Sequence, residues 1–408
     1  MHVSTMSSFF RNRFVQAIIL STLFVQIGVW VRNFAILLYV MEKTGNDPMS
    51  VSLIYVAEFV PIFLFSFIGG AFADRWRPKR TMIASELLSA VSVFVVLGAL
   101  VSGIWQAIFF ATLVSAILSQ FSQPSAMKLF KQHVPAEQLQ MGMGLFQSLI
   151  ALFLIAGPVI GTFVYQRYGI DVSIAVMGIA FLLSAAVLTY LPADRPEEEK
   201  AEQTSLKQEM KEGIQYVLSR PILKSLGGCF MAAGAAVGLI QPLGVFIVVE
   251  RLGMPKEFLQ WFMVCTGAGM LVGGGLAMGL AKKIAPARML FVGMLVSAIA
   301  MVITGWSEIW ALTLAVQFLS SLFMPMIQIG INTIMLQSTE EAFIGRVNGI
   351  LNPLFMGMMV VLMSLSGTLK EMSSLMTVYI IAGALFFVGM MFILPLLKHK
   401  LTEQAPAN

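Results

Sequence analysis

Charged residues are scarce in this sequence. Only 12% of its 408 residues are Asp, Glu, Lys or Arg, whereas soluble domains carry about 25%. Hydrophobic residues make up 58% of the chain, and the mean hydropathy is +0.85. So few charges cannot cover a water-exposed surface of normal size. The composition therefore excludes a soluble globular domain and indicates an integral membrane protein.

Side chains suited to catalysis or metal binding are also few. No G-x-x-x-x-G-K-[ST] phosphate loop occurs. The three histidines, His2, His133 and His399, fall at the termini or in a predicted loop. Cys229 and Cys265 lie inside predicted helices without metal-ligand spacing. We therefore expect no enzyme, no metal site and no cofactor.

Long apolar segments are what the sequence has in quantity. A membrane-spanning helix needs about 20 predominantly apolar residues. Three segments of this kind carry one charged residue each, namely 14–41, 48–73 and 81–101. The others contain no Asp, Glu, Lys or Arg: 104–127, 138–166, 172–193, 225–249, 258–281, 289–307, 309–339, 347–369 and 372–397. The sequence predicts an all-α membrane protein with twelve transmembrane helices.

The basic residues predict the orientation, because short cytoplasmic loops keep an excess of Lys and Arg. If the N-terminus is cytoplasmic, most basic residues fall on the inner side and Arg32 falls inside the membrane. The basic residues on the outer side are Lys43, Arg167, Arg251, Lys256 and Lys370. We therefore expect both termini in the cytoplasm. The net charge of +5 then reflects loops that face anionic lipid, and no nucleic-acid partner is expected.

One longer loop divides the chain near its middle. Residues 192–221 begin with a charged, Pro-containing stretch, and "SLKQEMKEGIQYVLSRP" follows. This second stretch predicts an amphipathic helix on the cytoplasmic face, with an apolar stripe formed by Leu206, Met210, Ile214 and Val217. The predicted organisation is a six-helix lobe over 1–191, the linker over 192–221, a second six-helix lobe over 222–398 and a tail over 399–408.

The two predicted lobes share a weak repeat, as transporters with two lobes often do. At an offset of 208 residues, three residues of the loop after the second helix align with chemically similar residues of the second lobe. The aligned sets are Arg75, Pro78 and Arg80 with Lys283, Pro286 and Arg288. We interpret the lobes as pseudo-symmetric.

The stretch "GGAFADRWRPKRTM", residues 69–82, places several charges between two apolar helices. It either anchors the topology or forms a moving contact. An anchor accounts for the basic residues but not for Asp74. This residue lies at the negative C-terminal end of its own predicted helix, so it needs positive charges nearby. We favour the moving contact.

These residues resemble the motif G-x-x-x-D-R-x-G-R-[RK] of the major facilitator superfamily, although Arg77 and Pro78 replace two of its positions. "EKTGND", "KEGIQYVLSRP" and "EAFIGRVNG" are similar to the macrolide-efflux-like branch. The resemblance implies drug or metabolite export driven by proton entry. It also implies a latch between the lobes, in which Asp74 meets the N-terminus of the eleventh helix. The latch residues would be Gly70, Asp74, Arg75, Lys79, Arg80 and Arg346.

A second resemblance lies in the fifth predicted helix. "AGPVIG", with Gly157, Pro158 and Gly161, is similar to the antiporter motif G-x-x-x-G-P-x-x-G-G. Phe153 and Thr162 replace two of its glycines, and the fourth helix lacks the arginine that drug antiporters often have there. The resemblance implies antiport, and these departures weaken it.

Two charges are predicted at the same depth in the membrane. Arg32 and Glu58 each lie about 12 Å from the outer boundary of adjacent antiparallel helices, at 1.5 Å per residue. An ionisable group inside the bilayer is a functional hypothesis by default. We predict that they pair and that Glu58 carries the coupling proton; the alternative is a permanent salt bridge between two helices. Glu86, on a helix expected to be peripheral, is predicted to be an interfacial residue near Arg80.

Uncharged amides recur in the helices expected to surround a central cavity. They are Gln26, Asn33, Gln120, Gln123, Gln241, Gln317, Gln328 and Asn332, set among 29 Met and 31 Phe. Met-rich walls repack around ligands of different shape, although Met and Phe are also ordinary lipid-facing residues. This pattern favours an amphiphilic or lipophilic substrate.

These observations predict a monomeric secondary exporter of lipophilic small molecules, such as macrolide antibiotics, in the cytoplasmic membrane of a bacterium. Its partners would be membrane lipids, the substrate and protons, with the proton gradient as energy source. The alternatives are an exporter of a siderophore or lysophospholipid and, third, an uptake carrier.

Overall fold

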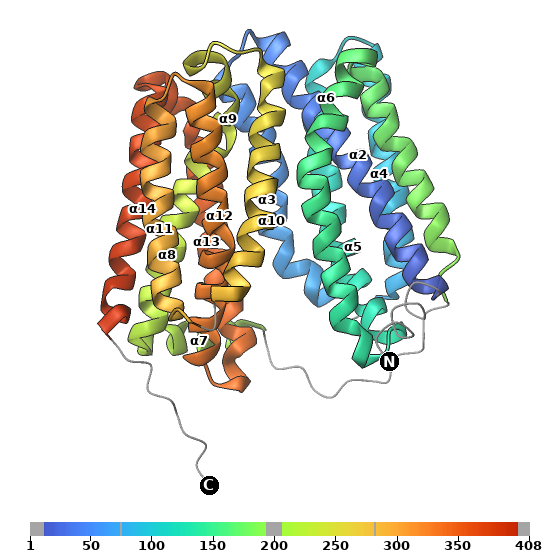
Figure 1. The fold of residues 1–408 in the computed structure, drawn as a ribbon. Helices are drawn as coiled ribbons and strands as arrows, with labels where there is room; N and C mark the ends of the chain where they lie inside the picture. The colour runs from blue at the N-terminus through green and yellow to red at the C-terminus, as the bar shows by residue number, and fades with distance from the viewer. Residues whose placement is uncertain (1–11, 74–75, 193–205, 281–282, 399–408) are drawn as a thin grey trace. The chain divides into compact units, whose positions relative to one another are not determined.

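The computed structural model describes residues 12–73, 76–192, 206–280 and 283–398. These residues form helices and connecting turns, and no β-strand occurs among them (Figure 1). The chain divides into two compact units, Met1–Glu199 and Lys200–Asn408. Helices are the expected solution for long apolar segments, because lipid offers no partners for backbone N–H and C=O groups. The all-α fold class predicted from the sequence is confirmed.

The first unit is built from long helices. They are α2 (Arg13–Thr44), α3 (Pro48–Ala73), α4 (Pro78–Val101), α5 (Ile108–His133) and α6 (Ala136–Thr189), with the short 3₁₀ turn η1 (Trp105–Ala107) before α5. Local sequence sets their ends. Asn12 caps α2 by accepting a hydrogen bond from the Phe14 N–H at 2.9 Å. Gly45 ends α2 in the left-handed conformation, with φ of 65°.

Helix α6 contains two predicted spans. Gly169 interrupts it with φ of 77° and ψ of −173°, a conformation that is open to glycine and costly for other residues. Figure 1 shows the chain turning back within α6. Among the described residues, eleven helices are long and apolar enough to cross a membrane, and one of them is Ser148–Thr189. The break at Gly169 separates the predicted segments 138–166 and 172–193, which gives twelve spans.

The core of the first unit lies mainly between α2 and α6. Phe14 and Ile18 of α2 are buried in one cluster with Leu188 of α6. The hydroxyls of Ser21 and Ser184 join the same two helices at 2.8 Å. Helix α5 packs against both α3 and α4. This packing brings side chains of α2, α3 and α5 into one polar network.

The described residues of the second unit form six spanning segments and one short amphipathic helix. The long helices are α8 (Pro221–Ile240), α10 (Leu259–Leu280), α11 (Pro286–Trp306), α12 (Trp310–Gln337), α13 (Ile344–Met372) and α14 (Leu375–Lys398), and α7 (Leu206–Ser219) precedes them. Proline at the first helical position starts α8 and α11, since its missing N–H is not needed there. Helix α8 packs against α13 and α14, and α12 packs against α10 and α11.

The span that begins with α8 is irregular in its second half. A 3₁₀ turn η2 (Gln241–Leu243), a single turn α9 (Gly244–Phe246) and a π-helical turn η3 (Ile247–Arg251) continue it. Lys370 Nζ, at the end of α13, lies 2.6 Å from Glu250 Oε1 and 4.5 Å from the centroid of the Phe246 ring. The irregular end of this span is therefore tied to α13. Two further short turns, η4 (Lys256–Phe258) and η5 (Glu341–Phe343), precede α10 and α13.

Candidate functional site

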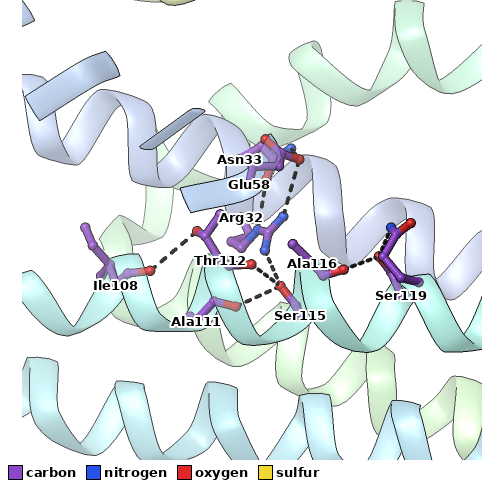
Figure 2. A network of polar contacts seen from close by, with 10 residues as sticks. Arg32, Asn33, Glu58, Ile108, Ala111, Thr112, Ser115, Ala116 and Ser119 are labelled. Carbon is purple, nitrogen blue, oxygen red and sulfur yellow. Dashed lines mark hydrogen bonds and ion pairs between the residues drawn. The ribbon is translucent and has the colours of Figure 1, made fainter. Parts of the chain in front are cut away.

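A buried arginine is the centre of the polar network in the first unit. Arg32 lies in the second half of α2 and is 3% exposed. Its guanidinium Nη1 donates to Ser115 Oγ of α5, and Nε donates to Asn33 Oδ1 at 2.9 Å. Its Nη2 lies 3.9 Å from Glu58 Oε1 of α3. Figure 2 shows these groups converging from three helices.

Glu58 is held more loosely than Arg32. The distance of 3.9 Å to the guanidinium is at the limit of an ion pair, and the Asn33 amide donates to the same oxygen at 3.3 Å. The Glu58 side chain is 22% exposed, against 4% for the Arg32 side chain. The structure thus brings the two predicted residues together in different environments: the cation is enclosed, and the carboxylate is accessible.

Ser115 is a member of the network that the sequence analysis missed. Its hydroxyl accepts from Arg32 and lies 2.7 Å from the Ala111 carbonyl oxygen of its own helix. The Thr112 carbonyl lies 3.1 Å away. A hydroxyl with a local acceptor can orient its lone pairs toward an incoming donor. In the sequence Ser115 is a serine seven residues after the start of α5. Serines are common in apolar helices and are uncharged, so nothing in the sequence distinguishes this one.

The predicted cavity amides are distributed over both units. In the first unit Asn33 joins the Arg32 network, while Gln120 Nε2 bonds to Ser119 Oγ at 3.1 Å within α5. In the second unit Gln317 Nε2 donates to Thr266 Oγ1 at 2.9 Å. The remaining amides do not form one cluster within a unit: Gln26 is half-buried in α2, Gln123 and Gln241 are exposed, and Gln328 bonds at 3.4 Å to the exposed Asn332.

The antiporter-like residues of α6 act as packing residues for α2. Gly157 lies against the indole ring of Trp30, and Gly161 lies against the Trp30 carbonyl oxygen and the Phe34 side chain. Any larger side chain at either glycine would overlap α2. Pro158 between them is buried. Because Trp30 is two residues from Arg32, this close contact fixes the stretch of α2 that carries the buried cation.

The predicted latch residues occupy different environments. Asp74 and Arg75 lie outside the described residues, and Gly70 is part of α3. Lys79 Nζ donates to the Thr189 carbonyl oxygen at 2.8 Å and to the Leu191 carbonyl. Lys79 therefore caps the C-terminal end of α6, where a cation is favourable.

The other two basic latch residues, Arg80 and Arg346, lie in different units and have different surroundings. Arg80 is exposed at the start of α4. In the second unit, Arg346 Nη1 lies 3.1 Å from Glu212 Oε2 of α7. Arg346 is therefore already paired within its own unit. The latch itself would join two units and stays a prediction.

Glu86 differs from its predicted environment. The sequence indicates an interfacial residue near Arg80, whereas the side chain is 7% exposed and lies between α4 and α5. Ser122 Oγ donates to Glu86 Oε1 at 3.3 Å. Within the described part of the chain, Oε2 has no hydrogen-bond partner and no ion pair includes Glu86. The sequence did not predict this burial or the unpaired oxygen, because the depth of a residue along a helix does not say which face of that helix packs against α5.

The helices, the two units and the charge buried among apolar spans define a multi-pass membrane transporter. The sequence profile of the Major Facilitator Superfamily matches residues 18–277 and 226–408. The chain belongs to this superfamily.

Known proteins resemble the chain at low identity. It is 24% identical to the uncharacterised transporter YkuC of Bacillus subtilis over 85% of this chain and 83% of that protein. It is 24% identical to macrolide efflux protein A of Streptococcus pyogenes over 61% of this chain and 62% of that protein. A crystal structure of the nucleoside transporter NupG matches with a TM-score of 0.69 at 16% identity, over 95% of this chain and all of that one. The likeness to NupG concerns the fold alone.

Proposed function

We propose that the protein exports lipophilic or amphiphilic small molecules in exchange for protons, by alternating access of one site to the two sides of the membrane. In this proposal the protein is a monomer of the bacterial plasma membrane with both termini in the cytoplasm. The resemblance to macrolide efflux protein A supports export, and the excess of basic residues in alternate loops supports the orientation.

The observation that carries the proposal is the unequal pair of Arg32 and Glu58. A proton-coupled carrier needs a group that can be charged in one state and neutral in another. Arg32 has hydrogen bonds to Ser115 and Asn33 in addition to its contact with Glu58. Protonation of Glu58 therefore does not leave the buried cation without partners, which would be costly. The network tolerates both states of the carboxyl group.

Movement of α3 would follow from the same change. Neutral Glu58 loses its attraction for the guanidinium across 3.9 Å. Pro61, one turn further along α3, lacks the N–H that would bond to the Ala57 carbonyl, so the helix is weakened beside Glu58. We propose that proton binding releases α3 from α2 at this point and that a substrate competes for the released carboxyl group.

The latch is a separate part of the proposal. Asp74 would meet the positive N-terminal end of α13 while the cytoplasmic side is closed. Asp74→Asn should leave the protein folded and inserted, bias it toward an inward-open state and lower transport. Spin-label distances across the cytoplasmic face test this proposal. Unchanged distances with unchanged transport would reduce the loop to a topology anchor.

The main test is uptake into inside-out proteoliposomes with an imposed pH difference. A labelled macrolide and a lipophilic fluorescent dye are suitable probes. Accumulation against the concentration gradient, coupled to proton movement, supports the proposal. Accumulation that ignores the pH difference contradicts proton coupling. Transport of a siderophore or lysophospholipid but of neither probe would favour the physiological exporters, and net movement in the opposite direction would favour an uptake carrier.

Glu58→Gln separates the coupling residue from general damage. The glutamine carbonyl can still accept from Asn33, so binding of a neutral substrate should survive while gradient-driven accumulation stops. Full gradient-driven export by this variant would contradict the role of Glu58. Glu86→Gln is the matched control, because it makes the same change at a second acidic residue within a spanning helix of the first unit.

A further inference from the structure

Helix α7 is fixed to the second unit by one face. Glu212 pairs with Arg346 at 3.1 Å, and the Tyr216 ring stacks on the Phe343 ring with centroids 4.2 Å apart and planes 10° apart. The Glu340 N–H donates to the Tyr216 hydroxyl at 3.1 Å. Aromatic stacking and an ion pair on the same side of one short helix leave it little freedom to rotate about its axis.

Two small or buried residues complete this packed face. Gly213 lies so close to the Arg346 backbone and the Ile350 side chain that an added Cβ would be 3.3 Å from each. Val217 is buried. Just beyond α7, Arg220 Nη2 lies 2.6 Å from Glu340 Oε1. The packed face therefore consists of Glu212, Gly213, Tyr216 and Val217, and differs from the stripe predicted from the sequence.

A second face of α7 is apolar and exposed. Met210, Ile214 and Leu218 are 50%, 43% and 60% exposed. Their spacing of four residues places them in one row along the helix. We call these three residues the α7 row. The sequence predicts Met210 and Ile214 in the same stripe as Val217, but the contacts with α13 divide the stripe: Val217 faces the protein, and the row does not.

Among the side chains that the structure describes beside the α7 row, the exposed charges are basic. Lys211 is exposed beside it, and Lys224 is exposed on the first turn of α8. The acidic Glu212 is neutralised by Arg346. Gln208, Gln215 and Ser219, on the face that adjoins Lys211, are uncharged and exposed. An exposed apolar row with a lysine at its edge and an exposed polar face beyond that lysine fits a helix that lies in a membrane interface.

The position of α7 along the chain also indicates contact with the membrane. The helix ends at Ser219, and the spanning helix α8 begins at Pro221. Leu218, the last residue of the α7 row, therefore lies three residues before the first residue of a spanning helix. We propose that the α7 row lies in the boundary between headgroups and acyl chains, in the leaflet predicted to be cytoplasmic, and that Lys211 and Lys224 bind anionic lipid headgroups there. This surface does not depend on the transported substrate.

The consequence is a connection between lipid and α13. Because α7 holds Arg346 and stacks on Phe343, the lipid leaflet, α7 and the N-terminal end of α13 form one continuous contact. Anionic lipid would keep α7 in place and thereby keep Arg346 paired with Glu212.

A fluorescent probe on α7 tests this inference in the full chain. The native cysteines Cys229 and Cys265 are replaced by serine, and an environment-sensitive NBD label is attached at Ile214→Cys or, as control, at Gln215→Cys. In nanodiscs that contain phosphatidylglycerol and brominated lipid, we expect blue-shifted emission and several-fold stronger quenching at position 214. Similar emission and quenching at both positions would overturn the inference.

The occupant and the charge are tested separately. A photo-crosslinker at position 214 should form adducts with lipid; adducts with the first unit or with a second copy of the chain would overturn the proposal. Lys211→Gln should lower the ratio of quenched to unquenched probe about fivefold in anionic nanodiscs. Lys283→Gln makes the same change in charge at an exposed lysine of the α10–α11 connection and should leave the ratio unchanged. An equal effect of both substitutions would contradict a specific role of Lys211.

Discussion

The two units place their charges differently. In the first unit, Arg32, Glu58 and Glu86 lie within spanning helices. In the second, the ion pairs of the described residues lie at helix ends, with Glu212–Arg346 and Arg220–Glu340 beside α7 and Lys370–Glu250 and Arg251–Glu308 at the opposite ends of the spans. Among the described residues of the second unit, no ion pair lies within the spans, and neutral side chains such as Gln317 and Thr266 form the hydrogen bond there.

Charges at helix ends and charges among apolar helices have different energetic consequences. An ion pair at a helix end is hydrated and contributes about 0–1 kcal/mol to stability, so its effect is to align segments. A charge among apolar helices is expensive unless it has partners, and a change in its protonation alters the packing around it. In the proposed function the first unit responds to protons, and the ion pairs of the second unit hold its helix ends in place.

The largest expected effect comes from removing the buried cation. Arg32→Ala leaves Glu58 without its charge partner and Ser115 without its donor, and should cost about 3 kcal/mol of stability, the lower end for breaking a buried ion pair because Glu58 is accessible. The double variant Arg32→Ala with Glu58→Gln should recover part of the loss. Thermal unfolding in detergent measures both, and a double variant no more stable than the single one would show that the two charges do not interact.

Ser115→Ala should have the next largest effect. It removes one acceptor from a buried guanidinium, and hydrogen bonds to charged groups contribute about 1.5–3 kcal/mol. We expect lower stability and weaker gradient-driven export, with the Arg32–Glu58 pair retained. Ser119→Ala is the matched control, because Ser119 lies one turn further along α5 and bonds to the Ala116 carbonyl and Gln120. Equal losses in both variants would mean that any missing hydroxyl on α5 is harmful and that Ser115 does not position Arg32.

The sequence was sufficient to predict the fold because a long apolar segment marks every span. Long apolar segments require helices, and even the turn at Gly169 falls in the gap between two predicted segments. The juxtaposition of Arg32 and Glu58 was also predictable, since charges inside the membrane are rare and their depth follows from counting residues. Ser115 was not predictable in this way. Its role depends on which face of α5 meets α2, and that choice is made by packing between helices distant in the sequence.

The same limit explains Glu86 and α7. Counting residues put Glu86 two turns into α4, near Arg80, but only the packing of α4 on α5 shows that it is buried beside Ser122. Amphipathic periodicity gave α7 one apolar stripe, but the contact with α13 divides that stripe into a packed Val217 and an exposed row. In both cases the missing information is the rotation of a helix about its own axis.

Glu86→Gln should change stability and export little. This result would distinguish Glu86 from Glu58 within the first unit. Oε1 accepts from Ser122, and an amide oxygen can do the same, whereas Oε2 has no partner among the described residues that an amide nitrogen would lose. We expect stability within about 1 kcal/mol of wild type and full gradient-driven export. Loss of export in this variant, with export retained in Glu58→Gln, would move the proton site to α4.

The smallest effect is expected for Glu308→Gln, the same chemical change as Glu58→Gln in the other unit. Glu308 pairs with Arg251 at 3.3 Å, but its side chain is 72% exposed, and Arg251 is also held by the Trp306 carbonyl oxygen. Solvent screens such a pair, so the free energy of unfolding should fall by less than about 0.5 kcal/mol, and added salt should remove the difference. Gradient-driven export should be unchanged. Glu58→Gln and Glu308→Gln are thus the same substitution in two settings. Glu58 lies beside an arginine among apolar helices, and Glu308 lies beside an arginine at a helix end. If Glu308→Gln also abolished proton-driven export, the assignment of proton coupling to the first unit alone would be wrong, because a hydrated pair at the end of the second unit would then control the same step.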